Sequence, residues 1–353
     1  MLDPWRAVSL CFKPREFLMR HDYLALAALA VLAGCNSSTP NQPAAIPAEE
    51  AGGGAQPLVA VKLALNWYPE AEHGGYYAAL RQGYYREAGL DVEIVKGGPN
   101  APVIPLVARG NMAFGIANAD GLLQGRAQDA PVVALMAPLQ TSPRCVMVHE
   151  SSDIDDFADL VKLKTLAAND SQSFFRFLTR RVPLANVTIV PYQGTVAMFL
   201  LNKNYGQQAY VFSEPFTARR EGGDPKSLLV ADLGFNPYTS VLFSSEPFLR
   251  ENADVARGMV AASVRGWEHY LAEPEETNLY LHEVNPEMSL EALAYGVEAL
   301  TPLVRDETAD AGGIGRMSAE RWRTLAEQLI EIESLEAGAV RPEEVFTTEF
   351  LPR

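Results

Sequence analysis

The chain has little of what marks several classes of enzyme and metalloprotein. It contains only 3 cysteines and 5 histidines in 353 residues, and none of them forms an HExxH or CxxC arrangement. The glycine patterns GxGxxG and GxxxxGK[ST], which hold nucleotide phosphates, are absent, and so is the GxSxG elbow of α/β hydrolases. We therefore expect no metal, no nucleotide cofactor and no hydrolase nucleophile at a site in this protein.

Clustered positive charge is also missing. The chain has 29 Lys and Arg against 44 Asp and Glu, a formal net charge of −15, and we find no basic run along it. Because phosphate backbones are bound by clustered Lys and Arg, nucleic acid is not an expected partner. With 48% apolar and 21% charged residues, the composition is that of a globular protein, long enough for two lobes.

A long hydrophobic run is missing from the N-terminal region. The apolar segment there, Tyr23–Ala33, is about eleven residues, whereas a transmembrane helix needs roughly 20. It follows Arg15 and Arg20, as the apolar region of a secretory signal does, with Met19 as a second candidate start. It ends in Leu32-Ala33-Gly34-Cys35, which resembles the lipobox of bacterial lipoproteins.

This pattern predicts a lipoprotein signal peptide over 1–34, with Cys35 acylated after cleavage. Residues 35–57 are rich in Pro, Gly, Ser and Ala and have no aromatic residue, so we expect a flexible tether there. The predicted location is outside the cytoplasm, anchored by lipid to the bacterial cell membrane. Cys145 is then the one cysteine left in the mature domain, and its apolar surroundings, "CVMV", predict a small buried residue rather than a nucleophile.

Strand-like and helix-like patterns alternate through the body of the chain. The segment 90–95 alternates strictly, with Leu90, Val92 and Ile94 on one face, and a helix over 73–88 ends at Gly89. Repeated strand–helix units predict parallel sheets with helical crossovers. Strands are expected at 58–65, 90–95, 112–117, 131–137, 165–169, 187–192 and 208–215, and helices near 102–109, 120–128 and 172–181, the last capped by residues 169–171.

The order of these elements predicts two discontinuous lobes. The segment 227–245 has the pattern of a return crossing, and two long amphipathic helices follow it. The first ends before Pro274 and the second starts at Ser318, with Trp267 and Trp322 expected in the core. We predict an α/β fold with mixed, largely parallel sheets, lobe 1 at 58–147 plus 237–353, lobe 2 at 148–236 and a ligand cleft between them.

Residues just after strands carry most weight for a site, because open α/β sheets bind ligands beyond the carboxyl ends of their strands. The candidate positions nearly all supply a hydrogen-bonding group or an aromatic face, which suits a flat polar solute. They are 66–67, 97–98, 118–120, 140–142, 169–171, 192–194 and 214–215.

The segment "LNWYPEAEHGGYYAALRQGYYREAGLDVEI" resembles the opening motif of the NMT1/THI5-like family of ABC-importer substrate-binding proteins. The resemblance continues through "GNMAFGIANADGLLQGRAQDAPVVALMAPLQTSP", the Glu-Pro pair at 214–215, "GFNPYTSVLFSSEPFL" and "TTEFLP". It implies the type II periplasmic-binding-protein fold and a solute such as a thiamine-precursor pyrimidine. Riboflavin and, more distantly, alkanesulfonate or nitrate are the alternative solutes within the same fold.

Asn66 and Trp67 are the first pair of candidate ligand contacts, because Trp67 offers a stacking face and Asn66 can donate to and accept from a heterocycle edge. His73, Gly74 and Gly75 stand where a helix begins, and the glycines allow close backbone approach. Of the neighbouring pair Tyr76 and Tyr77, we favour Tyr76 as facing the solute.

Glu214 is the expected carboxylate from lobe 2, a role that the resemblance implies for the Glu-Pro pair and that suits an amino or ring N–H group. The remaining expected contacts are Asn118, Ser142, Tyr192 and Tyr238. The paired acids Glu70 and Glu72 are compatible with acid–base chemistry. No nucleophile or metal partner accompanies them in the sequence, so we assign no catalytic residue.

We therefore expect a monomeric solute receptor that closes around its ligand by a hinge and delivers it to ABC permease and ATPase subunits. A second class of function is an enzyme, because some fungal members of the family make the thiamine pyrimidine from pyridoxal phosphate and a histidine. Their cysteine-rich motif is missing from this chain. A third class is a sensor or scaffold lipoprotein on the same fold.

Overall fold

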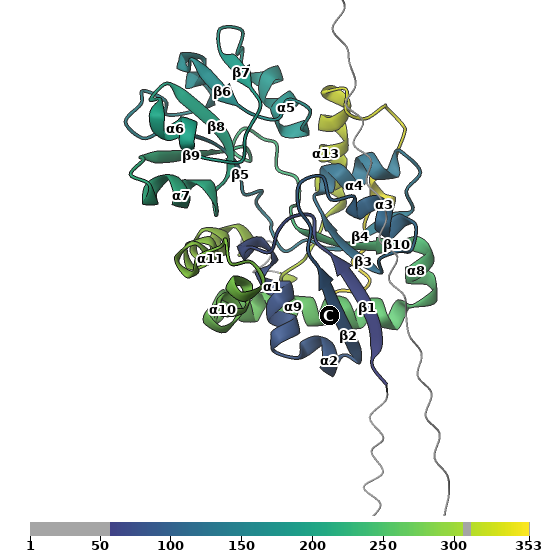
Figure 1. Cartoon of the computed structure of the whole chain (residues 1–353). Helices are drawn as coiled ribbons and strands as arrows, with labels where there is room; N and C mark the ends of the chain where they lie inside the picture. The colour runs from purple at the N-terminus through teal and green to yellow at the C-terminus, as the bar shows by residue number, and fades with distance from the viewer. Residues whose placement is uncertain (1–56, 306–311, 353) are drawn as a thin grey trace, which may run out of the picture. The chain divides into compact units, whose positions relative to one another are not determined.

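The computed structural model describes residues 57–305 and 312–352. The expected signal peptide, Cys35 and nearly all of the tether lie outside the described residues, so they stay predictions. Within the described residues, two five-stranded sheets organise the chain (Figure 1).

The first sheet has the order β2-β1-β3-β10-β4. Its parallel part pairs β1 with β2 and β3, and β10 then runs antiparallel to both β3 and β4. The inner strands of this sheet consist mainly of apolar residues, as expected for strands that are covered on both faces. The strand bounds are β1 Val59–Ala64, β2 Leu90–Val95, β3 Phe114–Ala117, β4 Val132–Met136 and β10 Val241–Ser245.

The second sheet repeats this plan with the order β7-β6-β8-β5-β9. Here β6 pairs in parallel with β7 and β8, and β5 is antiparallel to both β8 and β9. The strand bounds are β5 Arg144–His149, β6 Thr165–Ala167, β7 Thr188–Val190, β8 Tyr205–Tyr210 and β9 Pro225–Leu229. The expected α/β fold with mixed, largely parallel sheets is what the structure has.

Two crossover segments join the sheets, and they pair with each other. The first runs from β4 to β5 and the second from β9 to β10. An antiparallel bridge joins Leu139 to Thr239, and the Ser142 amide donates to Asn236 Oδ1 at 2.8 Å. The second crossover is the return crossing that the sequence predicts at 227–245, although its first residues still belong to the second sheet.

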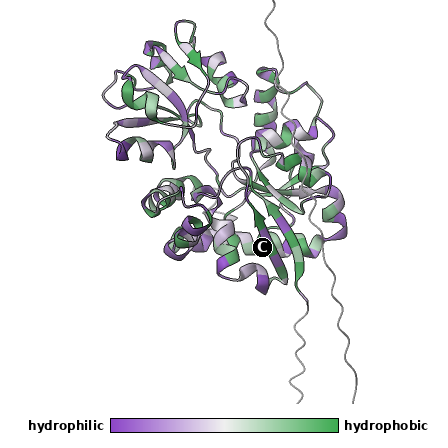
Figure 2. Ribbon diagram, viewed as in Figure 1, coloured by the Kyte–Doolittle hydropathy of each residue, from purple (hydrophilic) through white to green (hydrophobic). Residues whose placement is uncertain are grey.

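Helices pack around both sheets, and Figure 2 shows that apolar residues concentrate on the strands. The helices that follow strands of the first sheet are α1 Gly74–Arg81, α2 Tyr84–Glu87, α3 Val103–Ala108, α4 Ala119–Arg126 and α8 Glu246–Glu251. The second sheet carries α5 Ser173–Arg181, α6 Ala197–Leu201 and α7 Glu214–Arg220. The later helices are α9 Ala253–Ala272, α10 Glu275–Val284, α11 Leu290–Val304 and α13 Ala319–Glu331. Single 3-10 turns are η1 Ala71–His73, η2 Phe157–Lys162 and η3 Pro342–Glu344.

Three expectations about local structure are wrong. The helix predicted over 73–88 is broken at Gly83, whose φ of 75° places it in the left-handed region. The strand predicted over 208–215 ends at Tyr210, and Glu214 is the first residue of α7 rather than the end of a strand. No side chain from residues 169–171 caps α5, because Asn169 Oδ1 accepts instead from Ser171 in a local turn.

The buried aromatic residues behave as expected. Trp267 and Trp322 are fully buried, in α9 and α13, and Cys145 is fully buried in β5. Burial raises the pKa of the Cys145 thiol, so it stays protonated and unreactive near neutral pH.

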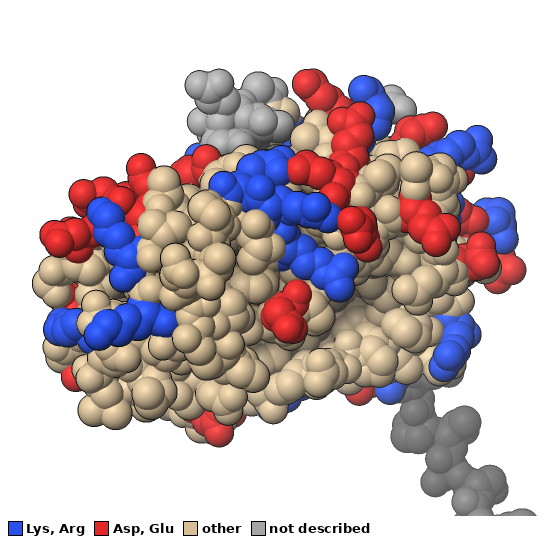
Figure 3. Space-filling model, turned by 90° about the horizontal axis from the view of Figure 1, so that it is seen from above, with Lys and Arg blue, Asp and Glu red and all other residues tan. Residues whose placement is uncertain are grey.

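No helix in 57–305 or 312–352 is long and apolar enough to span a bilayer. Figure 3 shows acidic and basic side chains interspersed on one face of the molecule.

Helix α1 packs closely on α9. A Cβ atom added to Gly75 would lie 2.2–2.4 Å from ring carbons of Trp267, and one added to Gly74 would lie 2.0–2.4 Å from Tyr270. Both glycines are thus needed for this contact. The expectation that Gly74 lets a solute approach is wrong in its reasoning, because the space beside Gly74 is filled by Tyr270.

We expect Gly75→Ala to lower the free energy of unfolding by about 1–3 kcal/mol, because the new methyl group must displace the Trp267 ring. Urea unfolding measures this. Gly121→Ala in α4 is the matched control, since its Cβ would meet only Ile104 Cδ1 at 3.5 Å, and alanine is favoured over glycine in a helix by up to about 1 kcal/mol. Equal effects of the two substitutions would contradict the packing argument.

Candidate functional site

A cavity of about 400 Å³, lined by both polar and apolar residues, lies at the carboxyl ends of β1 and β3. Asn66 follows β1, Asn118 follows β3, and the N-terminal turns of α3 and α5 complete the wall. Arg144 and Asp120 are the two charged side chains among the lining residues. The residues come from both sheets, which is the position that the strand-end rule predicts for a ligand.

His73 contacts the Asn66 side chain and is not itself a lining residue of the cavity. The two side chains approach at 3.0 Å between Asn66 Oδ1 and His73 Nε2, and His73 Nε2 also lies 3.4 Å from Glu72 Oε1. His73 is fully buried, and burial lowers its pKa from 6.5 to about 3, so the imidazole is neutral. His73 therefore stands behind the cavity wall and is not itself among the residues that line the cavity.

Ser240 is bonded both to a residue of the cavity wall and to two buried side chains. Its φ of 54° is unusual for a residue other than glycine, and all of its polar groups are used. Its hydroxyl donates to Glu72 Oε2 at 3.1 Å, its amide donates to Asn118 Oδ1 at 3.4 Å, and its carbonyl accepts from the Tyr76 hydroxyl at 2.8 Å. These bonds connect Glu72 with the second asparagine of the wall.

Three carboxyl groups interact behind this wall. Burial, followed by the charges of Glu72 and Glu214, raises the pKa of Glu70 well above its usual range. Burial raises the pKa of Glu72 to about 7, although the Ser240 bond and Arg144 lower it. Burial also raises the pKa of Glu214. The group therefore holds protons near neutral pH that exposed glutamates would have lost.

On the side of the second sheet, Glu214 is bonded to two tyrosine residues. Its Oε1 accepts from the Tyr192 hydroxyl, and its Oε2 accepts from the Tyr210 amide at 2.8 Å. Arg144 donates to the Tyr210 hydroxyl at 2.6 Å and to Gln172 Oε1. Arg144 also lies over the rings of Phe174 and Tyr210, at 4.6 and 4.9 Å from their centroids. It is thus fixed by aromatic and polar contacts while it lines the cavity.

The expected ligand contacts fall into different places. Asn66 and Asn118 line the cavity, and Tyr192 and Glu214 are bonded to each other beside Arg144. Trp67 is 41% exposed and meets Tyr68 edge to face at 5.5 Å, so its ring is free to stack on a solute.

Four expected contacts are buried in packing instead. Tyr76 is fully buried against Trp267, and Gly74 packs on Tyr270. The Tyr238 hydroxyl accepts from the Ser318 amide at 3.1 Å, and its ring lies beneath Arg321. Ser142 is buried between the crossover segments. None of these four is among the residues that line the cavity, and their contact with a solute stays a prediction.

The sequence reasoning missed Arg144, Asp120 and Ser240 as contributors to the site. Asp120 lies in the segment 118–120, which was selected because it follows a strand, so its position near the site could have been predicted from the sequence. Arg144 begins β5, and it reaches the cavity only because the crossover places β5 beside β8. No spacing in the sequence indicates that contact.

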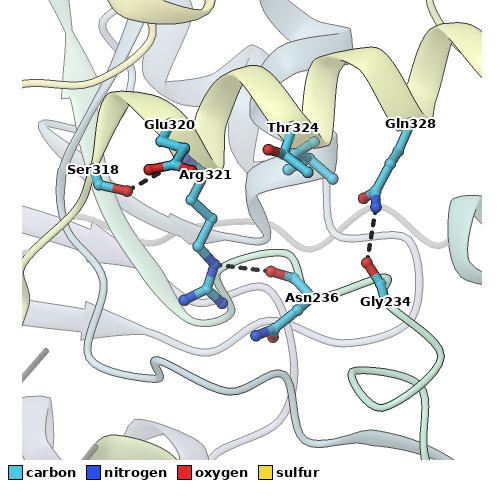
Figure 4. A pocket seen from close by; sticks show the side chains of 8 residues that line it. Gly234, Asn236, Ser318, Glu320, Arg321, Thr324 and Gln328 are labelled. Atoms are coloured by element: carbon cyan, nitrogen blue, oxygen red, sulfur yellow. Dashed lines mark hydrogen bonds between the residues drawn. The ribbon is translucent and has the colours of Figure 1, made fainter. Parts of the chain in front are cut away.

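A second hollow of about 280 Å³ lies along α13 (Figure 4). Arg321 Nε donates to the Asn236 carbonyl at 2.9 Å, and Gln328 donates to the Gly234 carbonyl at 2.8 Å. Ser318 caps the helix by accepting from the Arg321 amide. These bonds attach α13 to the second crossover.

A family model described as NMT1/THI5 like matches residues 70–277. The chain belongs to this family. Riboflavin-binding protein RibY of Chloroflexus aurantiacus is 27% identical over 344 residues, covering 93% of this chain and 97% of the relative. A formylaminopyrimidine-binding protein of Halalkalibacterium halodurans is 25% identical, covering 89% and 94%.

The family also contains proteins with other names. A 4-amino-5-hydroxymethyl-2-methylpyrimidine phosphate synthase of Legionella pneumophila is 23% identical, covering 65% of this chain and 74% of the relative. Among solved structures, the periplasmic aliphatic sulphonate binding protein SsuA of Escherichia coli matches with a TM-score of 0.61 at 16% identity, covering 81% and 91%. This likeness shows the fold, and the expected periplasmic-binding-protein architecture is confirmed.

The raised pKa of Glu72 predicts a stability change near neutral pH. A carboxyl group with a pKa of about 7 when folded and 4.5 when unfolded stabilises the folded state below pH 4.5, and this contribution is lost as pH rises through 7. His73 has the opposite sign, because its contribution is lost as pH falls below 6.5. Between pH 6.5 and about 8 we therefore expect the free energy of unfolding to fall, and Glu72→Gln to reduce that fall.

Urea unfolding at several pH values measures this slope. Glu93→Gln on the exposed side of β2 is the control, and it should keep the slope of the unchanged protein. A Glu72→Gln protein with an unaltered slope would mean that Glu72 is ionised in the folded state at pH 6.5.

Proposed function

We propose that this protein is an extracytoplasmic solute-binding protein of an ABC importer, and that it captures a small heterocyclic solute in the cavity at the ends of β1 and β3. The observation that carries the proposal is the wall of that cavity, where Asn66, Asn118 and Arg144 converge from both sheets. A volume of about 400 Å³ suits one small molecule. Two relatives that are matched over most of their length are named as binding proteins, and these names support a solute-binding function.

A thiamine-precursor aminopyrimidine is the first solute that we propose. Glu214 and Tyr192 stand beside Arg144, and carboxyl and hydroxyl oxygens accept well from amino groups. The formylaminopyrimidine-binding relative supports this assignment. Riboflavin is the second candidate, supported by the relative named RibY, which is matched over 97% of its length.

Solute release and capture are proposed to use the crossover segments as a hinge. The two segments pair through Ser142, Asn236, Leu139 and Thr239. The first leads into β5, whose Arg144 lines the cavity, and the second ends at Ser240, whose amide bonds to Asn118. Movement about them would open or close the wall, as in other two-lobed binding proteins. Permease and ATPase subunits are the proposed partners, with the receptor acting as a monomer.

Residues at the cavity do not support the enzymatic alternative. The lining residues include no lysine, the group that forms a Schiff base with pyridoxal phosphate. His73 of the "EHGG" segment is buried behind the wall with its pKa lowered to about 3, so it is a poor general base. We therefore propose binding without conversion.

Lipid anchoring through Cys35 is part of the proposal and rests on the lipobox-like sequence alone. In bacteria that express the full chain, we expect a labelled fatty acid to be incorporated into the protein and Cys35→Ala to abolish the label. Cys145→Ala is the control and should retain the label, since Cys145 is buried. A Cys35→Ala protein that still carries the fatty acid would contradict the anchor.

Calorimetric titration with formylaminopyrimidine and riboflavin tests solute capture. We expect saturable 1:1 binding of at least one of them without chemical change. Trp67→Ala should weaken it by up to about tenfold, because stacking contributes about 0.5–1.5 kcal/mol. Val161→Ala, an exposed apolar residue of η2, should not.

Three outcomes would count against the proposal. Conversion of either solute would favour an enzyme. Tight binding of a small alkanesulfonate, indifferent to Trp67→Ala, would favour a sulfonate receptor. Binding of none of these compounds would remove the support for a heterocycle receptor.

A further inference from the structure

The direction of hydrogen bonding at Asn66 follows from the groups behind it. His73 Nε2 faces two oxygen atoms, Asn66 Oδ1 at 3.0 Å and Glu72 Oε1 at 3.4 Å. A ring nitrogen with a lone pair would be repelled by both, so Nε2 carries the single proton of the neutral imidazole. His73 Nδ1 is then unprotonated, and it has no hydrogen-bond partner among the described residues.

This tautomer fixes the amide of Asn66. Because Asn66 Oδ1 accepts from His73, its amide nitrogen points away from His73, and Asn66 lines the cavity. An asparagine whose oxygen accepts on one side presents its nitrogen, a donor, on the other, so the buried pair decides which group a solute meets.

Three other side chains of this wall also present nitrogen, whereas Asp120 presents a carboxylate and Gln124, whose Nε2 donates to Ser173 Oγ at 3.4 Å, leaves its oxygen free. Asn118 Oδ1 accepts from the Ser240 amide, and its amide nitrogen, which also bonds to the Tyr210 hydroxyl, keeps a second N–H group for the cavity. Arg144 is a donor in every state. Gln172 Oε1 accepts from Arg144, so its nitrogen is the free end. The wall therefore has four side chains with N–H groups that can donate to a solute, those of Asn66, Asn118, Arg144 and Gln172.

We propose that Glu72 and His73 are positioning residues that turn the amide nitrogen of Asn66 into the cavity, so that the cavity selects solutes with ring carbonyl or ring nitrogen acceptors at this wall. The inference rests on the proposed function and narrows it. A pyrimidinedione edge, with two carbonyl groups, matches a donor wall better than an amino-substituted edge. Riboflavin carries such an edge, so the donor groups of this wall favour riboflavin over the aminopyrimidine that the Glu214 carboxyl group favours.

Calorimetric titrations at pH 8, where Glu72 is ionised, measure the selectivity. We expect riboflavin to bind at least tenfold more tightly than formylaminopyrimidine. Asn66→Asp replaces the donor with an acceptor of the same shape and should weaken riboflavin at least tenfold. Asn111→Asp, on an exposed turn, is the matched control and should leave the affinity unchanged.

Two His73 variants separate positioning from a general structural role. His73→Gln can still donate to Asn66 Oδ1 and should keep the affinity ratio of the two solutes within about threefold. His73→Leu cannot donate, so the amide is free to turn, and the ratio should fall toward one. Thermal unfolding identifies any variant that has lost its fold, and selectivity is then judged from the Asn66→Asp and His73→Gln proteins.

The outcomes distinguish this inference from the proposed function. If neither solute binds the unchanged protein, both are overturned. If formylaminopyrimidine binds more tightly, or if Asn66→Asp leaves riboflavin affinity unchanged, the donor wall is wrong and solute capture stands. If His73→Leu keeps the ratio while Asn66→Asp loses it, the positioning role of His73 is overturned.

Discussion

The pairing of the two crossover segments is the constraint on which the site depends. Leu139 bridges Thr239, and Ser142 bonds to Asn236, so the chain leaves the first sheet and returns to it along one fixed register. Each crossover then delivers the antiparallel strand of the sheet it enters, β5 or β10. Arg144 and Ser240 are the residues at those points of entry. A shift of one residue would turn both side chains to the opposite face.

Ser240 shows how this register reaches the cavity. A left-handed backbone costs a residue other than glycine of order 1–3 kcal/mol, and such strain persists where surrounding contacts determine it. The contacts here are Tyr76, Glu72 and Asn118, each bonded to a different group of Ser240. Ser240 therefore belongs to the proposed hinge, bonds to the buried carboxyl group of Glu72 and supports Asn118 in the cavity wall. A change in the crossover on opening would alter the groups that hold Asn118.

Much of the fold could be predicted from the sequence, because periodicity and strand–helix alternation are local properties. The strict alternation over Leu90–Val95 corresponds to β2, and Ser318 caps α13 where the helix was expected to start. The break at Gly83 and the start of α7 at Glu214 were missed, although both have local signals: a glycine that adopts the left-handed region, and Pro215 in the first turn of a helix. For the site, the rule of strand ends located Asn66 and Asn118. It could not separate a tyrosine such as Tyr76, buried against α9, from one that faces a solute.

The buried acids are hard to explain by stability alone. Removing a carboxyl group from water is costly unless it is neutralised or well bonded. Among the described residues, the close partners of the Glu72 carboxyl group are Ser240 and, through a weak contact, His73. An apolar side chain of similar size would avoid this cost, yet it could not hold the proton of His73 on Nε2. Without that proton, the amide of Asn66 could turn either way, and a donor wall and an acceptor wall would compete in one cavity. The unfavourable burial of Glu72 is thus understandable as the condition for a single hydrogen-bonding direction at the solute.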